Sequence, residues 1–333
     1  MSDKVSSKAA KKNKAFSSLA AQKLIIFATL IVLIIFFAIM SPNFLLIDNI
    51  ISILLATCVN GLLALGVTFV IITGGIDLSI GTVMTFSAVI SGLAVTMFGI
   101  PLWLGMIICI LVGTIIGSLT GLMVARLKIP AFIATLGVMM ITSGLSLVVT
   151  GARPVYFPSE YKQIAVGSLL GNIIPGFRLP NAVLVLFAMA IIASIILNKT
   201  VMGRYNFAIG SNSEATRLSG VNVAGWLTGI HALAGAFFGV AGIIISSRLG
   251  SAQPAIGQGY ELEAIAAVVI GGTSLSGGQG TISGTIIGAF IMSVLTNGLQ
   301  IVGVAQEWQT VVIGGVVILA VFIDTYRRRN QNI

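Results

Sequence analysis

Residues 50–81 read IISILLATCVNGLLALGVTFVIITGGIDLSIG. A helix needs roughly 20 consecutive, mostly apolar residues to cross a bilayer, and residues 50–73 meet that requirement. The octet 74–81 then interrupts the apolar pattern with glycines, an aspartate and a serine. This stretch therefore predicts a membrane-spanning helix that is followed by a broken or re-entrant segment.

The composition of the whole chain extends this prediction. The chain has 333 residues, of which 57% are hydrophobic and 8% are charged, whereas a soluble domain carries about 25% charged residues. The apolar segments are long runs rather than ten-residue stretches of alternating hydrophobicity, so helices are favoured over a β-barrel. No small-residue cleavage site follows the apolar run 24–40, which we interpret as an uncleaved first span. The sequence thus predicts an all-α integral membrane protein.

About ten transmembrane helices are expected in the region 24–326, between basic tails at 1–23 and 327–333. The expected spans are 24–40, 50–73, one ending near 98, one ending at 124, 130–150, one ending at 197, 226–247, 261–272, one ending near 302, and 308–323. A second Gly/Ser-rich interruption falls at 271–280, and a polar, proline-containing loop occupies 151–180. The helices are expected to be broken or re-entrant near 74–81 and 271–280.

The basic residues predict the orientation of these spans. With the N-terminus in the cytoplasm, fourteen of the eighteen Lys and Arg residues fall on the cytoplasmic side, as the positive-inside rule requires. Arg153, Lys162, Arg178 and Arg248 fall outside. The net charge of +9 therefore reflects orientation in a lipid bilayer, and a nucleic-acid partner is not expected. Both termini are predicted to be cytoplasmic, and loop 151–180 external.

Residues 198–223 form the longest polar stretch on the predicted cytoplasmic side apart from the two ends, and we call them the coupling segment. Ser211 and Glu214 have the spacing of a capping box, and Gly220 follows where a helix would stop. A short helix held outside the bilayer is expected to dock a partner by helix-in-groove contact. A solvated connector is the alternative reading.

Asp77 is the acidic residue most expected to lie at membrane depth. An ionised group there is costly and is usually kept for function or tightly paired. One hypothesis places Asp77 and Ser79, with Gly74 and Gly75, on the translocation path. The alternative is a structural acid that accepts hydrogen bonds from backbone amides of the broken segment. The octet 74–81 also matches 271–278 at five of eight positions, and transporters built from repeats often carry broken helices at corresponding places.

The other polar residues that stand out are interpreted mainly as structural. Glu261 and Glu263 open the span 261–272, where acidic residues complement the dipole of a helix N-terminus. Arg248 and Glu261 are also candidates for contact with a partner on the outer face. His231, the only histidine, is expected to pack in a helix interface. Cys58 and Cys109 lie in apolar runs, so burial is expected rather than a disulfide or a metal site.

The sequence does not predict catalysis. Residues 275–279 read LSGGQ, which matches the signature motif of ATP-binding-cassette ATPases. A nucleotide site also needs a phosphate-binding loop with a Gly-Lys pair, and the sequence contains no Gly-Lys dipeptide. No Ser/His/Asp set, paired-carboxylate spacing or metal-ligand cluster stands out, so we expect no catalytic residue, no metal and no cofactor on this chain.

Two glycine series suggest close helix packing. Gly113, Gly117 and Gly121 recur every four residues, and a second series is formed by Gly280, Gly284 and Gly288. Such series let helix backbones approach closely in membranes. They are expected to pack within the chain, and a dimer seam is the alternative.

Several ordered motifs resemble those of the ribose-type permeases of bacterial ABC sugar importers. The resemblance covers essentially the whole chain after the basic N-terminus. The motifs are GGIDLSIG at 74–81, PAFIATL at 130–136, Gly203-Arg204, Glu214-Ala215 with Arg217 and Gly220, GYEL at 259–262, and GGTSL at 271–275. In the EAA-like coupling loop of this family, Thr216 stands in place of a second alanine.

The resemblance implies a permease subunit in the bacterial inner membrane that imports a monosaccharide such as ribose. It implies three partners: an ABC ATPase with two cassette domains that carries ATP and Mg²⁺, a periplasmic sugar-binding protein, and a second copy of the permease or a related one. It further implies that the coupling-loop residues are Gly203, Arg204, Glu214, Ala215, Arg217 and Gly220. An ion-coupled secondary transporter and an ABC permease for branched-chain amino acids are the alternatives.

Overall fold

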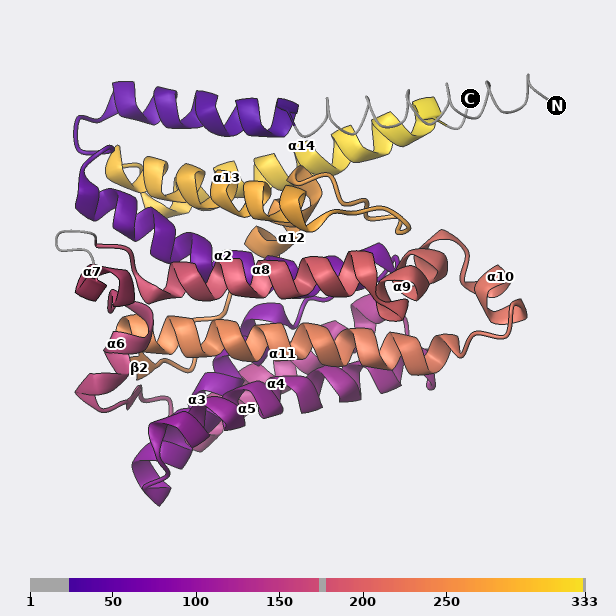
Figure 1. Ribbon diagram of the computed structural model, residues 1–333, viewed down its shortest axis with the longest axis horizontal. Coiled ribbons are helices and arrows are strands. Elements are labelled where there is room, and N and C mark those ends of the chain that lie inside the picture. Colours follow the sequence, from indigo (N-terminus) through magenta and orange to yellow (C-terminus); the bar gives the residue numbers. More distant parts are fainter. Residues whose placement is uncertain (1–23, 174–177, 332–333) are drawn as a thin grey trace.

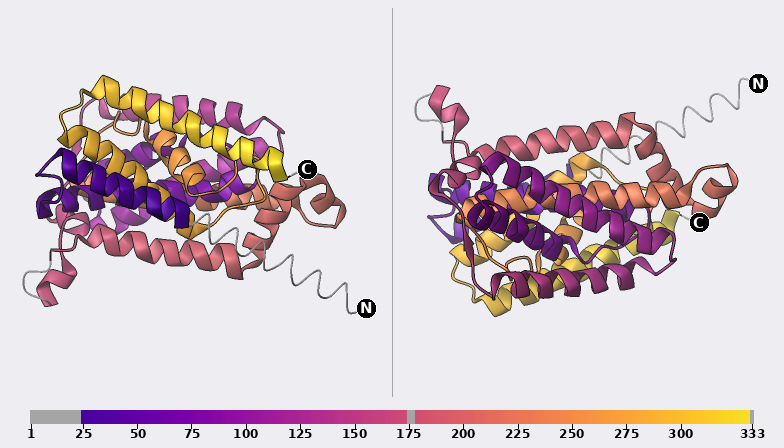
Figure 2. Two further views of the ribbon diagram at one scale, coloured as in Figure 1. Left: turned by 90° about the horizontal axis from the view of Figure 1, so that it is seen from above. Right: turned by 90° about the horizontal axis from the view of Figure 1, so that it is seen from below.

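The computed structural model describes residues 24–173 and 178–331. The predicted tail 1–23 and residues 332–333 lie outside the described residues. The structure confirms an all-α architecture whose helices lie side by side along the long axis of the molecule (Figure 1, Figure 2). We refer to the end that carries α9 and α10 as the α10 end and to the opposite end as the α7 end.

After the apolar helix Leu24–Met40, the elements follow in chain order. They are α2 (Ile47–Ile72), α3 (Ile80–Phe98), α4 (Leu102–Ala125), α5 (Ala131–Thr150), β1 (Val155–Tyr156), η1 (Ser159–Tyr161), α6 (Lys162–Ala165), α7 (Leu169–Ile173), α8 (Asn181–Lys199), α9 (Val201–Ser211), α10 (Ser213–Leu218), α11 (Val223–Leu249), β2 (Ser251–Ala252), α12 (Tyr260–Ile270), α13 (Ile282–Ile301) and α14 (Gln306–Gln331).

Within the described residues, eight helices are long and apolar enough to cross a membrane, and Leu24–Met40 is a shorter apolar helix. The remaining predicted span, 261–272, corresponds to α12, which has 11 residues and at about 1.5 Å per residue covers only part of a bilayer. The residues between β2 and α12, 253–259, belong to no helix or strand. Both predicted breaks are present, because residues 73–79 and 271–281 separate helices.

The helix α2 forms the centre of the bundle. Every residue from Thr57 to Ile72 is buried, and α8, α11, α12 and α13 pack around this helix. A helix that is apolar on all sides is expected to be enclosed in this way. The outer helices expose large apolar side chains such as Ile115, Ile141, Ile191 and Ile318, as lipid-facing surfaces do.

Both glycine series pack within the chain. A Cβ atom on Gly113 would collide with the backbone of Gly235 on α11, and a Cβ atom on Gly117 would collide with the carbonyl group of His231. In the second series, Gly284 lies against the backbone of Gly271, and Gly288 against that of Ala267. The close helix pairs are therefore α4 with α11 and α12 with α13. The structure supports intrachain packing over the alternative of a dimer seam.

The described part of the polar loop 151–180, up to residue 173, is folded rather than open. Its strand β1 pairs antiparallel with β2, so that Val155 lies opposite Ala252. The amide of Phe157 donates to the carbonyl oxygen of Gly250 at 3.0 Å, and the ring of Tyr161 stacks on that of Phe157. This loop is thereby attached to the end of α11.

Candidate coupling and translocation sites

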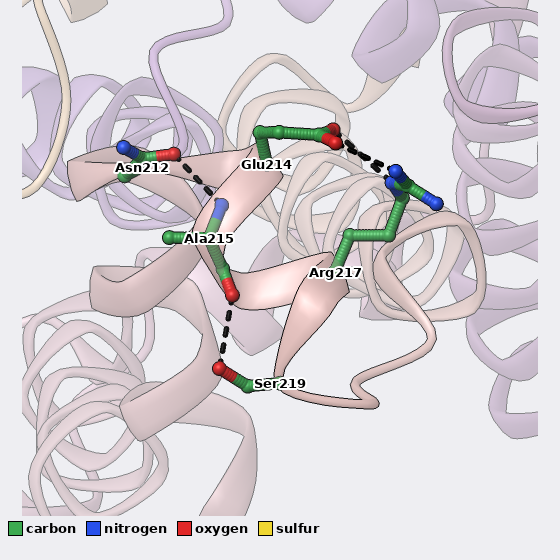
Figure 3. A network of polar contacts seen from close by, with 5 residues as sticks. All are labelled: Asn212, Glu214, Ala215, Arg217 and Ser219. Atoms are coloured by element: carbon green, nitrogen blue, oxygen red, sulfur yellow. Dashed lines mark hydrogen bonds and ion pairs between the residues drawn. The ribbon is translucent and has the colours of Figure 1, made fainter.

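The coupling segment folds as two helices that meet at Asn212. This residue has an extended backbone, with φ −161° and ψ 100°, which ends α9 and turns the chain into α10. The Asn212 side-chain oxygen accepts a hydrogen bond of 2.9 Å from the amide of Ala215 (Figure 3). The N-cap is therefore Asn212, and the predicted capping box on Ser211 and Glu214 is wrong. Ser211 is the last residue of α9. Its backbone is therefore helical, whereas an N-cap residue has a non-helical backbone.

The predicted stop at Gly220 is confirmed. Gly220 has a φ of +85°, a conformation that glycine adopts at no steric cost. Its amide donates to the carbonyl of Arg217 at 3.0 Å, and the amide of Val221 donates to that of Thr216 at 3.4 Å. These two bonds form a Schellman motif. The helix α10 thus has specific caps at both ends, with a hydroxyl bond from Ser219 to the carbonyl of Ala215 at 2.9 Å (Figure 3).

Glu214 and Arg217 form an exposed ion pair on α10. The Arg217 guanidinium donates to the two Glu214 oxygens at 2.6 and 3.1 Å (Figure 3). These hydrogen bonds lower the pKa of Glu214. The two side chains are 65% and 62% exposed, and such pairs add little to stability because water screens them. The pair is therefore free to interact with another protein.

The remaining residues predicted to take part in coupling lie either at the surface or in the contact between α8 and α9. Arg204 and Ala215 are exposed, and Leu218 presents 74% of its apolar side chain to solvent. Gly203 is buried against the carbonyl group of Leu197, where a Cβ atom would collide. Gly203 therefore lets α9 fold back against the end of α8, while α10 projects from the end of the molecule (Figure 1).

The C-terminal part of α9 touches both broken segments. A Cβ atom on Gly210 would collide with the carbonyl oxygen of Ile72, the last residue of α2. The amide of Gly278 donates to that same oxygen at 2.8 Å. The sequence indicated neither contact, because Gly210 belongs to none of the motifs. The coupling segment and the two breaks thus meet in one junction, formed by Gly210, Ile72 and Gly278.

The two matching octets are neighbours in space. Gly74 and Gly277 have φ values of +82° each, and the backbone nitrogen of Gly74 lies beside Gly277. Gly75, the other glycine of the first pair, packs beside Val70. The sequence echo therefore corresponds to two broken helices that pack against each other.

Asp77 lies in the first break and is 3% exposed. Its Oδ1 atom accepts from the amide of Ser79 at 2.8 Å and from the Ser79 hydroxyl at 2.6 Å. This carboxylate stands just before α3, where a negative group complements the helix dipole. The contacts match the structural hypothesis for Asp77, and its place on a transport path stays a prediction.

The other singled-out polar residues have local partners. The Glu261 carboxylate accepts from the amide of Gly259 at 3.1 Å. His231 is buried, and its Nδ1 atom lies 2.9 Å from the carbonyl oxygen of Leu227. Arg248 and Glu263 both line a cavity, which also includes residues of the GYEL motif at 259–262. No group of three or more potential metal ligands occurs in the described part of the chain.

Comparisons with known proteins identify the family. A family model described as "Branched-chain amino acid transport system / permease component" matches residues 49–321. The ribose import permease protein of Haemophilus influenzae is 39% identical over 305 residues, which cover 90% of this chain and 92% of the relative. The corresponding protein of Bacillus subtilis is 41% identical over 307 residues, covering 91% and 92%. The chain belongs to the family of ribose-type ABC import permeases.

Other sugar permeases of this family are nearly as similar. The galactose/methyl galactoside import permease protein of Haemophilus influenzae is 37% identical over 334 residues, covering 96% of this chain and 98% of the relative. No solved structure matches the chain. The family assignment fits the architecture above, since a multi-pass helical bundle is what a permease requires.

Proposed function

We propose that this chain is the membrane subunit of an ATP-driven importer of a monosaccharide, ribose or a related sugar. The relatives carry the names of ribose, galactose and fructose import permeases, which supports a sugar as the substrate. One structural observation carries the mechanism: the capped, exposed helix α10 is joined through α9 to the two broken helices. A push on α10 therefore reaches the transmembrane region through backbone contacts.

The partner at the α10 end is proposed to be an ATPase with two cassette domains, which binds ATP and Mg²⁺. The chain itself then performs no chemistry. Glu214, Arg217 and Leu218 offer an ion pair beside an exposed apolar side chain, which suits helix-in-groove docking. Closure of the cassettes on ATP would displace α10, and Gly203 and Gly210 would pass this motion to α8 and α2. A second permease copy, or a related permease, completes the complex.

The partner at the α7 end is proposed to be a periplasmic sugar-binding protein. The two predicted docking regions, loop 151–180 and residues 248–261, are held together by the β1–β2 pair. The hydroxyl of Ser247 donates to the carbonyl of Tyr161 at 2.6 Å, and the Tyr161 hydroxyl lies 3.1 Å from that of Ser246. A platform tied in this way can transmit contact with a partner to α11.

The basic residues support an inner-membrane orientation with both termini in the cytoplasm. At the α10 end, Arg126 and Lys128 follow α4, Lys199 ends α8, and Arg204 and Arg217 lie on α9 and α10. The α7 end carries Arg153, Lys162 and Arg178 in its loop and Arg248 in the last turn of α11. The positive-inside rule then places the α10 end in the cytoplasm, which is the side where ATP is present.

Uptake by purified protein tests this proposal. The permease, its ATPase and its binding protein are reconstituted in liposomes, and entry of labelled ribose, galactose, fructose and leucine is measured with and without ATP. We expect entry of a sugar that needs ATP and the binding protein. Entry driven by a proton or sodium gradient without the ATPase would support the ion-coupled alternative. ATP-driven entry of leucine alone would support the amino-acid alternative.

A further inference from the structure

A polar cavity of about 860 Å³ opens between α2, α13, α14 and the start of α12. Cavities that hold small molecules measure about 300–1,000 Å³, so this volume is sufficient for a monosaccharide. The cavity lies at the first turns of α2 and α14 and the last turns of α13. It therefore occupies the α7-end half of the bundle, on the proposed periplasmic side.

The cavity reaches well into the membrane region. Its lining extends from Asn49 to Ala56 on α2, from Gln300 back to Ser293 on α13, and from Gln306 to Gly314 on α14. At about 1.5 Å per residue each helix contributes about 10–12 Å of depth, a third of a hydrocarbon core of about 30 Å. The first residues of α12 also line the cavity.

Most of the residues that line the cavity have side chains that can hydrogen-bond with a neutral solute. Six of these residues come from three helices, namely Ser52, Ser293, Asn297, Gln300, Gln309 and Thr310. Amides and hydroxyls both donate and accept hydrogen bonds, which matches the hydroxyl groups of a sugar. Polar side chains at membrane depth are costly in contact with lipid and usually face a water-filled cavity or the protein interior. This composition indicates a chamber for solute rather than a lipid-filled gap.

Two details sharpen the chemistry of the cavity. Among the described residues that line it, the acidic and basic ones are Glu263 and Arg248, one of each kind. The buried hydroxyl of Thr296 has no hydrogen-bond partner although a polar group without a partner is costly to bury. The neighbouring amides of Asn49 and Asn297 bond each other at 3.0 Å. The paired amides therefore order this part of the wall, whereas the Thr296 hydroxyl is covered and is not exposed to a solute.

We propose that this cavity receives the neutral, polyhydroxylated solute during transport and holds it through amide and hydroxyl groups. This inference deepens the proposed function and rests on it. The route through the outer half of the protein then passes between α2, α13 and α14. Asp77 and Ser79 do not line this cavity, so they are not part of this proposed site.

A bulky side chain at the wall tests the route. Thr310 and Thr325 lie on the same helix, are both exposed, and each bonds the carbonyl four residues earlier, at 3.1 and 2.9 Å. Only Thr310 of this pair lines the cavity. In the reconstituted complex we expect Thr310→Trp to lower ATP-driven sugar uptake by about tenfold or more, because it fills the binding space. The matched control Thr325→Trp should stay near the unmodified rate.

Cysteine labelling provides a test with small substitutions. In a background with Cys58→Ala and Cys109→Ala, the variants Gln300→Cys and Thr310→Cys receive a charged, membrane-impermeant thiosulfonate reagent from the outside. Both cysteines should react and lose uptake, since water fills the cavity. Ile191→Cys, on the exposed apolar surface of α8, should not react. These readouts do not depend on whether the tryptophan variant folds.

The outcomes separate the two proposals. Equal uptake by Thr310→Trp and Thr325→Trp, or no reaction at both cavity cysteines, would overturn the cavity as the solute route. Reactive cavity cysteines in a complex that shows no ATP-dependent uptake of ribose, galactose or fructose would instead contradict the proposed function.

Discussion

The amide nitrogen of Gly278 donates a 2.8 Å hydrogen bond to the carbonyl oxygen of Ile72. This bond joins the segment after α12 to the end of α2, and Gly210 of α9 packs against the same carbonyl. The exposed coupling helix is therefore in backbone contact, through α9, with both interrupted helices. Most of the predictions below concern this path from surface to membrane.

Gly210→Val should uncouple ATP hydrolysis from uptake. The added side chain collides with backbone atoms of Ile72 and Gly278, and overpacking of this kind costs about 1–3 kcal/mol. ATPase activity and sugar uptake are measured together in proteoliposomes. Gly137→Val is the control, because nothing lies near Gly137 on α5. Normal uptake per ATP in Gly210→Val would show that the junction does not transmit force.

Gly220→Val should weaken the cap of α10. Its φ of +85° is disfavoured for residues with a side chain by about 1–2 kcal/mol, and more for a β-branched one. We expect ATPase binding to fall while the permease still accumulates in the membrane. Co-purification with the ATPase measures this, and Ser219→Ala, which removes one hydroxyl bond and keeps the backbone, serves as a milder comparison. Unchanged binding by Gly220→Val would sink the docking hypothesis.

The Glu214–Arg217 pair should matter for docking and little for stability. Because Arg217 lowers the pKa of Glu214, any stabilisation from the pair is present above the ordinary carboxyl pKa of 4.5 and is lost as the pH falls through the lowered value. Near neutral pH we expect Glu214→Gln to leave the melting temperature unchanged, while Glu214→Lys reduces ATPase binding. In Arg217→Ala the pKa of Glu214 should rise toward its ordinary value, as carboxylate-labelled NMR can detect.

Asp77 can be tested by changing its charge and its acceptor separately. Asp77→Asn keeps an oxygen that can accept from Ser79, whereas Asp77→Ala removes it and should cost about 0.5–2 kcal/mol, as for other helix-start acceptors. We expect the alanine variant to melt at a lower temperature and the asparagine variant to assemble. Loss of transport by an assembled Asp77→Asn protein would instead give the negative charge a role on the path.

Gly117→Leu should damage the fold of the single chain. The leucine would force α4 away from α11 at the carbonyl of His231, with a cost of about 1–3 kcal/mol or more. Thermal unfolding in detergent measures this loss. Gly144→Leu on α5, where no atom lies near the glycine, is the matched control. If Gly117→Leu changed only the oligomeric state and not the melting temperature, the glycine series would have to act between chains.

The sequence predicted the features that depend on neighbouring residues. Apolar runs and glycine interruptions located the spans and both breaks, whereas the orientation indicated by the charges stays a prediction. The stop at Gly220 followed from the need for a left-handed residue after a helix. The prediction of a capping box was wrong because Ser211 belongs to α9 and the N-cap of α10 is Asn212. The error arose between neighbouring residues, because α9 ends where α10 begins.

The tertiary structure alone decided which surfaces meet. Apolar helices in a membrane protein carry hydrophobic side chains on all sides, so periodicity does not distinguish a lipid-facing side from a packed one. The contact of Gly210 with Ile72, the pairing of β1 with β2, and the assembly of Ser52, Ser293 and Thr310 around one cavity join residues far apart in the chain. Patterns of neighbouring residues in the sequence do not show which distant segments of the chain come into contact. The sequence by itself therefore determined a membrane permease and the bounds of its polar segment 198–223, whereas only packing determined how that segment reaches the breaks and which residues line the cavity.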